Sequence, residues 1–244
     1  MAFLLTVFVT ALLVVNLTGL IPYIGGGRPT IWLTTVALFA FTFFGVGMML
    51  KDRPSGVFID ERNKISLSRI QLVLWSVLLI SALVTAGLGN VLAGAPSPLA
   101  ISIPGQVWAL LGLGSFTAVA APAILQRKEK DAEPTRLDEI KTNLRTADTL
   151  RGAVTATGAV VKKATPKDAR WMDIVRGDTD NADYVDVSKL QQLSFTILLI
   201  TVYGAGIFAL FQSSGPITKF PDVDQGFLAL LGISHAAYLA NKAN

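Results

Sequence analysis

The feature that most constrains this chain is the distribution of its charged residues. Five long windows contain no Asp, Glu, Lys or Arg: 1–27, 29–50, 70–126, 190–218 and 225–241. A helix needs roughly 20 apolar residues to cross the hydrocarbon core of a bilayer, so the longest window has room for two helices. Hydrophobic residues make up 52% of the chain and the mean hydropathy is +0.54. These properties predict an integral membrane protein.

The windows predict an all-α fold of six transmembrane helices, arranged as three hairpins. The expected spans are 1–23, 31–50, 70–93, 106–125, 190–212 and 225–240. We divide the chain into a first hairpin (1–50), a second hairpin (66–125), a cytoplasmic and partly helical segment (126–189) and a third hairpin (190–244). In the cytoplasmic segment, apolar spacing predicts an amphipathic helix over 134–150.

The second and third hairpins repeat one pattern. A shift of 120 residues brings 66–115 onto 186–235 without an insertion, and Ala-Leu-Leu-Gly at 109–112 falls on the same four residues at 229–232. With six spans, both hairpins have the same orientation in the membrane. The pattern therefore predicts a parallel internal duplication, whose copies are related by an axis along the membrane normal.

Basic residues predict the topology. The connections 51–69 and 126–189, together with Lys242, contain 19 of the 21 Lys and Arg residues. Basic loops of membrane proteins stay on the cytoplasmic side. We therefore expect a multi-pass protein of the inner (cytoplasmic) membrane with both termini inside. The same rule accounts for the net charge of +4 without a nucleic-acid partner.

The residue types argue against an enzyme. Without cysteine, the chain has no disulfide, thiolate nucleophile or Cys-ligated metal. The single histidine lies inside a predicted span, where no Asp, Glu, Lys or Arg accompanies it. The acidic stretch 178–183 departs from the calcium-loop pattern, so we interpret it as a solvated turn. We expect no catalytic residue, no metal site and no cofactor.

Each repeat begins with a polar helix start. Arg69 and Gln71 in the first copy correspond to Lys189 and Gln191 in the second, behind the N-cap residues Ser66 and Asp186. These side chains predict either a helix cap with a charged stop at the headgroup level or a lipid or docking site.

Small residues follow in the second half of each repeat. They are Gly112, Gly114, Gly232 and Ser234. Small side chains let helices approach closely, so we expect helix packing here, with a pore lining as the alternative. The lone His235 is either a neutral imidazole bonded to a neighbouring helix, a pH-sensitive or pore site, or a metal ligand.

An apolar cluster lies in the cytoplasmic segment. Trp171, Ile174 and Val175 fall on one face of a short predicted helix, which suits a helix lying in the headgroup region.

The second repeat also resembles a known group. Val187-Ser-Lys-Leu-Gln191 and Ala229-Leu-Leu-Gly-Ile-Ser-His-Ala-Ala-Tyr-Leu239 are similar to the LSKxQ-like helix start and the ALLGISHAGYL-like last span of uncharacterised prokaryotic multi-span membrane proteins. The resemblance implies that the hairpin is a recurring unit, and it implies no activity.

Two functions fit these observations. The first is a membrane anchor or scaffold that engages a cytoplasmic protein partner through its 126–189 segment. The second is an oligomeric ion channel or pore lined by small residues of the fourth and sixth spans. In both cases we expect the lipid bilayer and further copies of the chain as partners.

Overall fold

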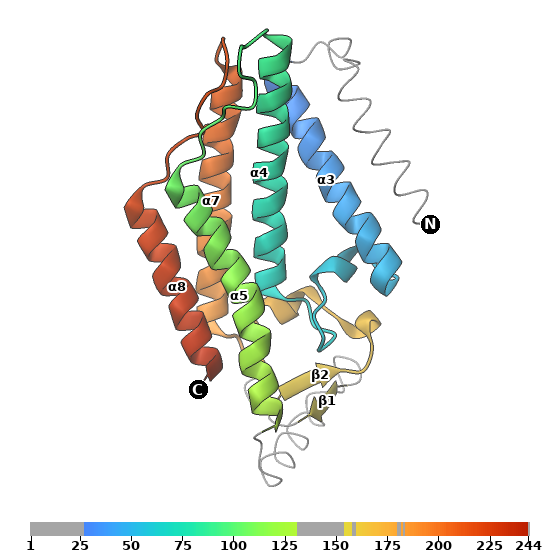
Figure 1. Ribbon diagram of the computed structural model, residues 1–244. Coiled ribbons are helices and arrows are strands. Elements are labelled where there is room, and N and C mark those ends of the chain that lie inside the picture. Colours follow the sequence, from blue (N-terminus) through green and yellow to red (C-terminus); the bar gives the residue numbers. More distant parts are fainter. Residues whose placement is uncertain (1–26, 131–153, 158–159, 180–181, 183, 244) are drawn as a thin grey trace.

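The computed structural model describes residues 27–130, 154–157, 160–179, 182 and 184–243, and the helices among them dominate the fold (Figure 1). In chain order the elements are α3 (Arg28–Lys51), η1 (Pro54–Phe58), α4 (Leu67–Leu92), α5 (Gly105–Lys130), β1 (Val154–Thr157), β2 (Val160–Lys163), η2 (Pro166–Asp168), η3 (Trp171–Val175), α7 (Val187–Gln212) and α8 (Gln225–Ala243). The first predicted span and the predicted helix over 134–150 lie outside the described residues.

Four long helices form a bundle. The bundle consists of α4, α5, α7 and α8, in which α4 and α8 each contact both α5 and α7. Helix α3 packs against α4 and α7 from outside (Figure 1). Apolar side chains fill the interior, since a chain of this composition buries apolar surface between its helices. The buried members of this core include Trp75, Leu78, Leu110, Leu199, Tyr203 and Leu231.

Four helices, α3, α4, α5 and α7, are long and apolar enough to cross a membrane. This supports the prediction of a membrane protein. The predicted sixth span is present as helix α8, but it does not belong to these four. Its sequence is interrupted by His235 and ends in Asn241 and Lys242, which lowers its apolar character.

The helix boundaries follow the spacing of the sequence repeat. Helices α4 and α7 have 26 residues each, and their first residues, Leu67 and Val187, are 120 positions apart. The starts of α5 and α8, Gly105 and Gln225, have the same separation. The caps differ, however. Asp186 accepts hydrogen bonds from two backbone amides of α7, whereas the Ser66 side chain makes no cap bond at α4.

The loops that close the two hairpins are bonded to each other. Ser102 donates from its backbone amide to Thr218 (2.7 Å) and accepts from Phe220 (3.0 Å). Asn90, at the end of α4, donates to the carbonyls of Pro98 (3.0 Å) and Ile217 (2.8 Å) and accepts from the Ile217 amide (2.7 Å). This buried side chain therefore joins both loops at one end of the bundle.

The opposite end of the bundle has the polar segments. There, β1 and β2 form an antiparallel hairpin, followed by the short 3₁₀ helices η2 and η3. The small hairpin departs from the all-α expectation. Its second strand is rich in β-branched residues, Val160 and Val161, which favour extended backbone over helix.

Close backbone contact fixes the connection between α3 and α4. A Cβ atom on Gly47 would lie 2.5 Å from the carbonyl oxygen of Pro54, and one on Gly56 would collide with the backbone of Gly47. Only glycine fits at either position. This contact holds η1 against α3 and places the polar residues 60–64 below the bundle.

Candidate functional site

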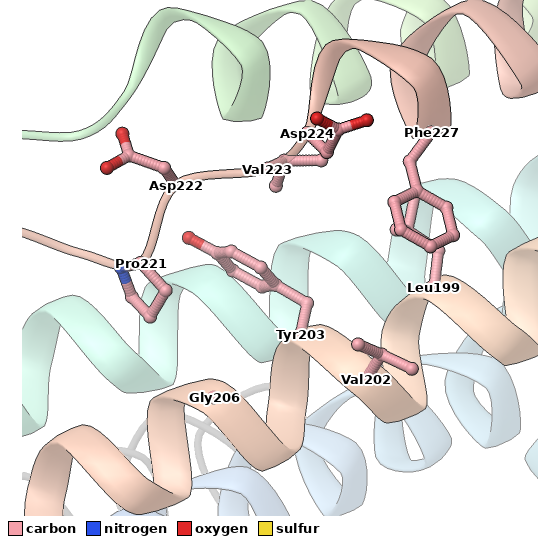
Figure 2. A pocket seen from close by; sticks show the side chains of 9 residues that line it. All are labelled: Leu199, Val202, Tyr203, Gly206, Pro221, Asp222, Val223, Asp224 and Phe227. Atoms are coloured by element: carbon pink, nitrogen blue, oxygen red, sulfur yellow. The ribbon is translucent and has the colours of Figure 1, made fainter.

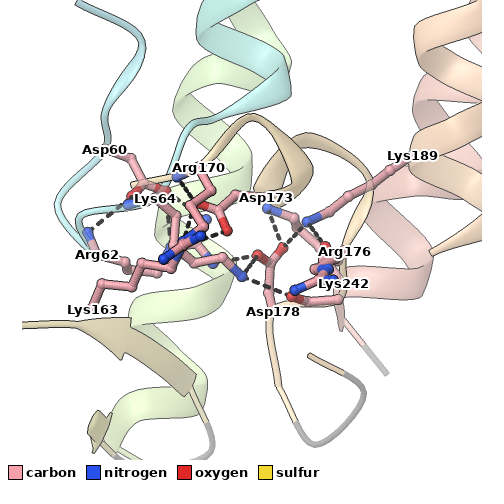
Figure 3. Close-up of polar contacts among 11 residues, drawn as sticks. Asp60, Arg62, Lys64, Lys163, Arg170, Asp173, Arg176, Asp178, Lys189 and Lys242 are labelled. Carbon is pink, nitrogen blue, oxygen red and sulfur yellow. Dashed lines mark hydrogen bonds and ion pairs between the residues drawn. The ribbon is translucent and has the colours of Figure 1, made fainter. Parts of the chain in front are cut away.

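A single buried carboxylate lies at the polar end of the bundle. Asp178 is only 5% exposed and pairs with four cations (Figure 3). Its oxygens lie 2.6 Å from Arg62 Nη1, 3.3 Å from Lys64 Nζ, 2.9 Å from Lys189 Nζ and 3.1 Å from Lys242 Nζ. We call these five residues the Asp178 cluster.

The members of the Asp178 cluster come from separate parts of the chain. Arg62 and Lys64 belong to the connection between α3 and α4, Lys189 to the first turn of α7, and Lys242 to the last turn of α8. Asp178 follows η3 in the segment between the two hairpins. One side chain therefore joins the polar segment to the α3–α4 connection and to both helices of the α7–α8 hairpin.

Backbone carbonyls complete the coordination of the lysines. Lys64 Nζ donates to the Gly177 carbonyl at 2.8 Å, and Lys189 Nζ donates to the carbonyl of Arg176. Lys242 Nζ lies 4.8 Å from the centre of the Tyr238 ring, within range of a cation–π contact. These contacts matter because a buried charge is costly unless it is paired and hydrogen-bonded.

A second set of bonds fastens the polar segment to the α3–α4 connection. Lys163 pairs with Asp173 at 2.8 Å, and its backbone amide donates to the Arg62 carbonyl at 2.9 Å. Arg53 donates to the carbonyls of Pro166, Lys167 and Ala169. The segment 160–178 is thus docked on the bundle by charged side chains that reach backbone acceptors.

Positive charge is in excess inside the Asp178 cluster. Asp60, which pairs with Arg62 at 2.5 Å, adds a second carboxylate against four cations. Burial lowers the pKa of Lys64 to about 8, a shift that Asp178 opposes and that Lys189 and Arg62 reinforce. Burial alone would raise the pKa of Asp178, but the four surrounding cations hold it well below its usual range. Asp178 is therefore ionised at neutral pH.

A network of hydrogen bonds lies deeper, between all four helices of the bundle. The Gln71 side chain of α4 donates to Thr196 of α7 at 2.6 Å, and Gln192 Nε2 donates to the side-chain oxygen Oε1 of Gln71 at 3.3 Å. His235 Nδ1 of α8 lies 3.0 Å from Gln192 Nε2 and 2.5 Å from the hydroxyl of Thr117 in α5. All five side chains are buried. We call them the inter-helix network.

The inter-helix network does not continue through the bundle. Beyond it, the buried apolar core that includes Trp75, Leu78 and Leu199 fills the space between the helices. In the described residues, the interior of one copy therefore holds a closed polar pocket of side chains rather than an axial path.

The structure separates the residues predicted at the helix starts. Gln71 and Lys189 are buried in the inter-helix network and the Asp178 cluster. Arg69, in the first turn of α4, instead binds the Ile59 carbonyl at 2.8 Å and Glu61 at 2.6 Å, both in the connection that precedes this helix. Gln191 is exposed, and its neighbour Gln192 makes the inward contact. The repeat register alone could not reveal this shift of one residue.

Three of the four predicted packing residues face open space within the described part of the chain, and the fourth is buried. A Cβ atom on Gly112, Gly114 or Gly232 would meet no other atom within 4 Å among the described residues. Ser234 is buried, and its hydroxyl has no hydrogen-bond partner in the described part of the chain. His235 fits the interpretation of an imidazole bonded to neighbouring helices, through Thr117 and Gln192.

The predicted interfacial helix is the short 3₁₀ helix η3. Trp171 is 58% exposed and its ring lies 6.1 Å from that of Phe58, while Ile174 packs beside the same phenylalanine. Residues three apart share a face of a 3₁₀ helix, which explains why Trp171 and Ile174 stay together. Val175 is half-buried one position further on.

Sequence reasoning missed the centre of the site. Asp178 had the pattern of a solvated acidic turn, and that interpretation was wrong because the side chain is buried and paired. The sequence signal for a buried carboxylate was the excess of basic residues in the connections. That excess was already explained by membrane topology, so it did not point to an ion-pair cluster. Nothing in the spacing of Arg62, Lys64 and Lys242 indicated that they meet.

Comparison with protein-family models, with curated proteins and with solved structures finds no significant match for this chain.

Proposed function

We propose that this chain is a non-enzymatic anchor or scaffold of the cytoplasmic membrane that engages a cytoplasmic protein partner. The observation that carries the proposal is the Asp178 cluster. It fixes the polar segment to the α3–α4 connection and to the α7–α8 hairpin, so that the segment becomes a rigid surface at the end of the bundle. A surface held in this way suits recognition, because it loses little conformational entropy when a partner binds.

The proposal includes six spans, with both termini in the cytoplasm, and a duplicated hairpin. The common separation of 120 residues between the starts of α4 and α7 and between those of α5 and α8 supports the duplication. The charge-free window 1–27 and the helix α8 supply the two spans beyond the four apolar helices. The basic connections support the cytoplasmic assignment.

Exposed apolar side chains mark the surface for the partner. Trp171 and Met172 are 58% and 52% exposed at the polar end of the molecule. Large exposed side chains of this kind are typical of contact surfaces, and tryptophan is enriched where partners bind. We propose that η3 presents these two residues to a cytoplasmic protein.

Photo-crosslinking in cells tests the proposal. A photoreactive residue at position 172 should give one dominant protein adduct, and Asp178→Asn should remove it while the chain stays in the membrane. Asp52→Asn is the matched control, because it makes the same charge change at an exposed position of the polar end. Adducts with lipid only, or an adduct that persists in Asp178→Asn, would contradict the proposal.

The alternative function is an oligomeric channel, and the open helix surface at Gly112 and Gly232 of α5 and α8 is the observation that favours it. Because the bundle interior is packed, the conducting path would have to run between copies. Purified protein in planar bilayers, with His235→Ala as the comparison, tests this function. Currents that respond to pH and change in the variant would support it, and silence across pH and voltage would exclude it.

A further inference from the structure

A pocket lies at the end of the bundle opposite the Asp178 cluster. It has a volume of about 310 Å³ and lies between the second half of α7, the loop before α8 and the first turn of α8 (Figure 2). Leu199, Val202, Val223 and Phe227 give it apolar walls. A volume of this size is enough for a small ligand or for the headgroup of a lipid.

Tyr203 supplies the pocket with an unpartnered hydroxyl. The side chain is only 4% exposed, and its hydroxyl has no hydrogen-bond partner in the described part of the chain. The centre of its ring lies 6.1 Å from that of Trp75, and the hydroxyl extends toward Pro221 and Asp222 (Figure 2). Buried hydroxyls are nearly always bonded, so this one marks a place where a ligand atom completes the site.

Two carboxylates line the pocket beside Tyr203. Asp222 is 66% exposed and pairs with Lys219 at 2.6 Å, and Asp224 accepts from the amide of Gly226 at 2.8 Å. Both retain free acceptor capacity, since a carboxylate has about four lone-pair sites. No Lys or Arg is among the residues that line this pocket. The pocket is thus apolar inside and negatively charged on one side.

We propose that this pocket binds a membrane phospholipid whose headgroup has a primary ammonium, of the ethanolamine class. The ammonium donates to Asp222 and Asp224, a phosphate oxygen accepts from the Tyr203 hydroxyl, and the acyl chain follows the apolar wall. Val202 and Phe227, which are half-exposed on that wall, provide the route for the chain out of the pocket. A phospholipid with an uncharged glycerol headgroup leaves Asp224 without a cation and leaves Asp222 with Lys219 alone.

Gly206 gives a way to close the pocket. A Cβ atom there would lie 3.6 Å from Pro221 Cγ, an ordinary contact, so alanine fits and a larger side chain extends into the cavity. Gly206→Leu is therefore a blocking variant and Gly206→Ala is its control.

The test uses the full chain in nanodiscs that contain equal amounts of two phospholipids with identical acyl chains. One has an ethanolamine headgroup and the other has a glycerol headgroup. Native mass spectrometry of the released protein counts the lipid that stays bound. We expect about tenfold preference for the ethanolamine lipid in the wild type and in Asp52→Asn. Asp222→Asn/Asp224→Asn should reduce it to about twofold or less, and Gly206→Leu should abolish retention.

Tyr203→Phe keeps the ring and removes the hydroxyl, so it should weaken retention severalfold in a chain that folds normally. Thermal unfolding in the same nanodiscs checks the fold of every variant. Equal retention of both lipids by the wild type, or an undiminished preference in folded Asp222→Asn/Asp224→Asn, would overturn the proposal.

Discussion

At the scale of residues, the charge of Asp178 keeps four cations buried at the end of the bundle. Removing one partner of a buried ion pair costs about 3–5 kcal/mol, because an uncompensated charge stays inside the protein. We therefore expect Asp178→Asn to lower the free energy of unfolding by that order, measured by chemical denaturation in detergent. Asp52→Asn, at the exposed C-cap of α3, should change it by less than about 0.5 kcal/mol.

The charge balance of the Asp178 cluster allows a second test of this prediction. If the loss in Asp178→Asn comes from uncompensated cations, removing one of them should recover part of it. Lys242→Met takes away a cation and keeps an unbranched side chain over the Tyr238 ring. The double variant Asp178→Asn/Lys242→Met should be more stable than Asp178→Asn alone. A double variant that is less stable would contradict the electrostatic explanation.

Lys64 gives the Asp178 cluster a response to alkaline pH. Its pKa is about 8 in the folded protein and 10.5 in the unfolded chain, so between these values the unfolded state binds more protons. Stability from this group therefore rises as the pH increases from 8 to 10.5, by about 3 kcal/mol in total. The difference in unfolding free energy between wild type and Lys64→Gln, measured across this range, should show that rise. A flat difference would place the pKa of Lys64 near its ordinary value.

At the scale of elements, Asn90 holds the two closing loops together. Its amide makes three hydrogen bonds, to Pro98 and to both backbone groups of Ile217. Asn90→Leu leaves these buried groups unpaired, at about 1–3 kcal/mol for each. We expect faster hydrogen exchange at Ile217 and a lower unfolding temperature. Asn90→Asp keeps the acceptor for the Ile217 amide but sets a buried carboxylate against two carbonyl oxygens, so it should also be destabilising. Wild-type stability in either variant would contradict this assignment.

The inter-helix network couples elements that the sequence keeps far apart. Gln71→Met and Thr117→Val remove its polar groups from α4 and α5 with little change of volume. Hydrogen bonds between membrane helices contribute about 0.5–2 kcal/mol each. A double-mutant cycle on thermal stability should give a coupling of that order, transmitted through Gln192 and His235. Strict additivity would mean that the side chains do not act as one network.

The elements also show how far sequence reasoning reaches here. Charge-free windows and turn residues predicted α3, α4, α5 and α7 closely, because their apolar length is set by the membrane. The same windows predicted the helix α8. They could not predict the Asp178 cluster, whose members lie up to 180 positions apart in the sequence and meet only through tertiary packing. Gln192 was missed because helix rotation, and not repeat register, decides which glutamine faces inward.

At the scale of the whole molecule, the chain has two chemically different ends. One contains the Asp178 cluster and the other the paired loops 93–104 and 213–224. Since the chain has no cysteine, single cysteines report accessibility without a background. We expect Ser97→Cys and Ser214→Cys to react with an impermeant thiol reagent in intact cells. Lys167→Cys should react only after the membrane is opened, and its labelling in intact cells would contradict the topology.

Rigid docking of the polar segment on the bundle is the central claim of the scaffold proposal. Hydrogen exchange of residues 160–179 in lipid nanodiscs, compared between wild type and Asp178→Asn, tests it most directly. We predict slow exchange in the wild type, because the contacts of Arg53, Lys163 and Asp178 hold this segment closed against the rest of the protein. The variant should exchange at least about tenfold faster over the same residues, as local opening becomes easier. Rapid exchange in the wild type, or equal rates in both proteins, would contradict the claim.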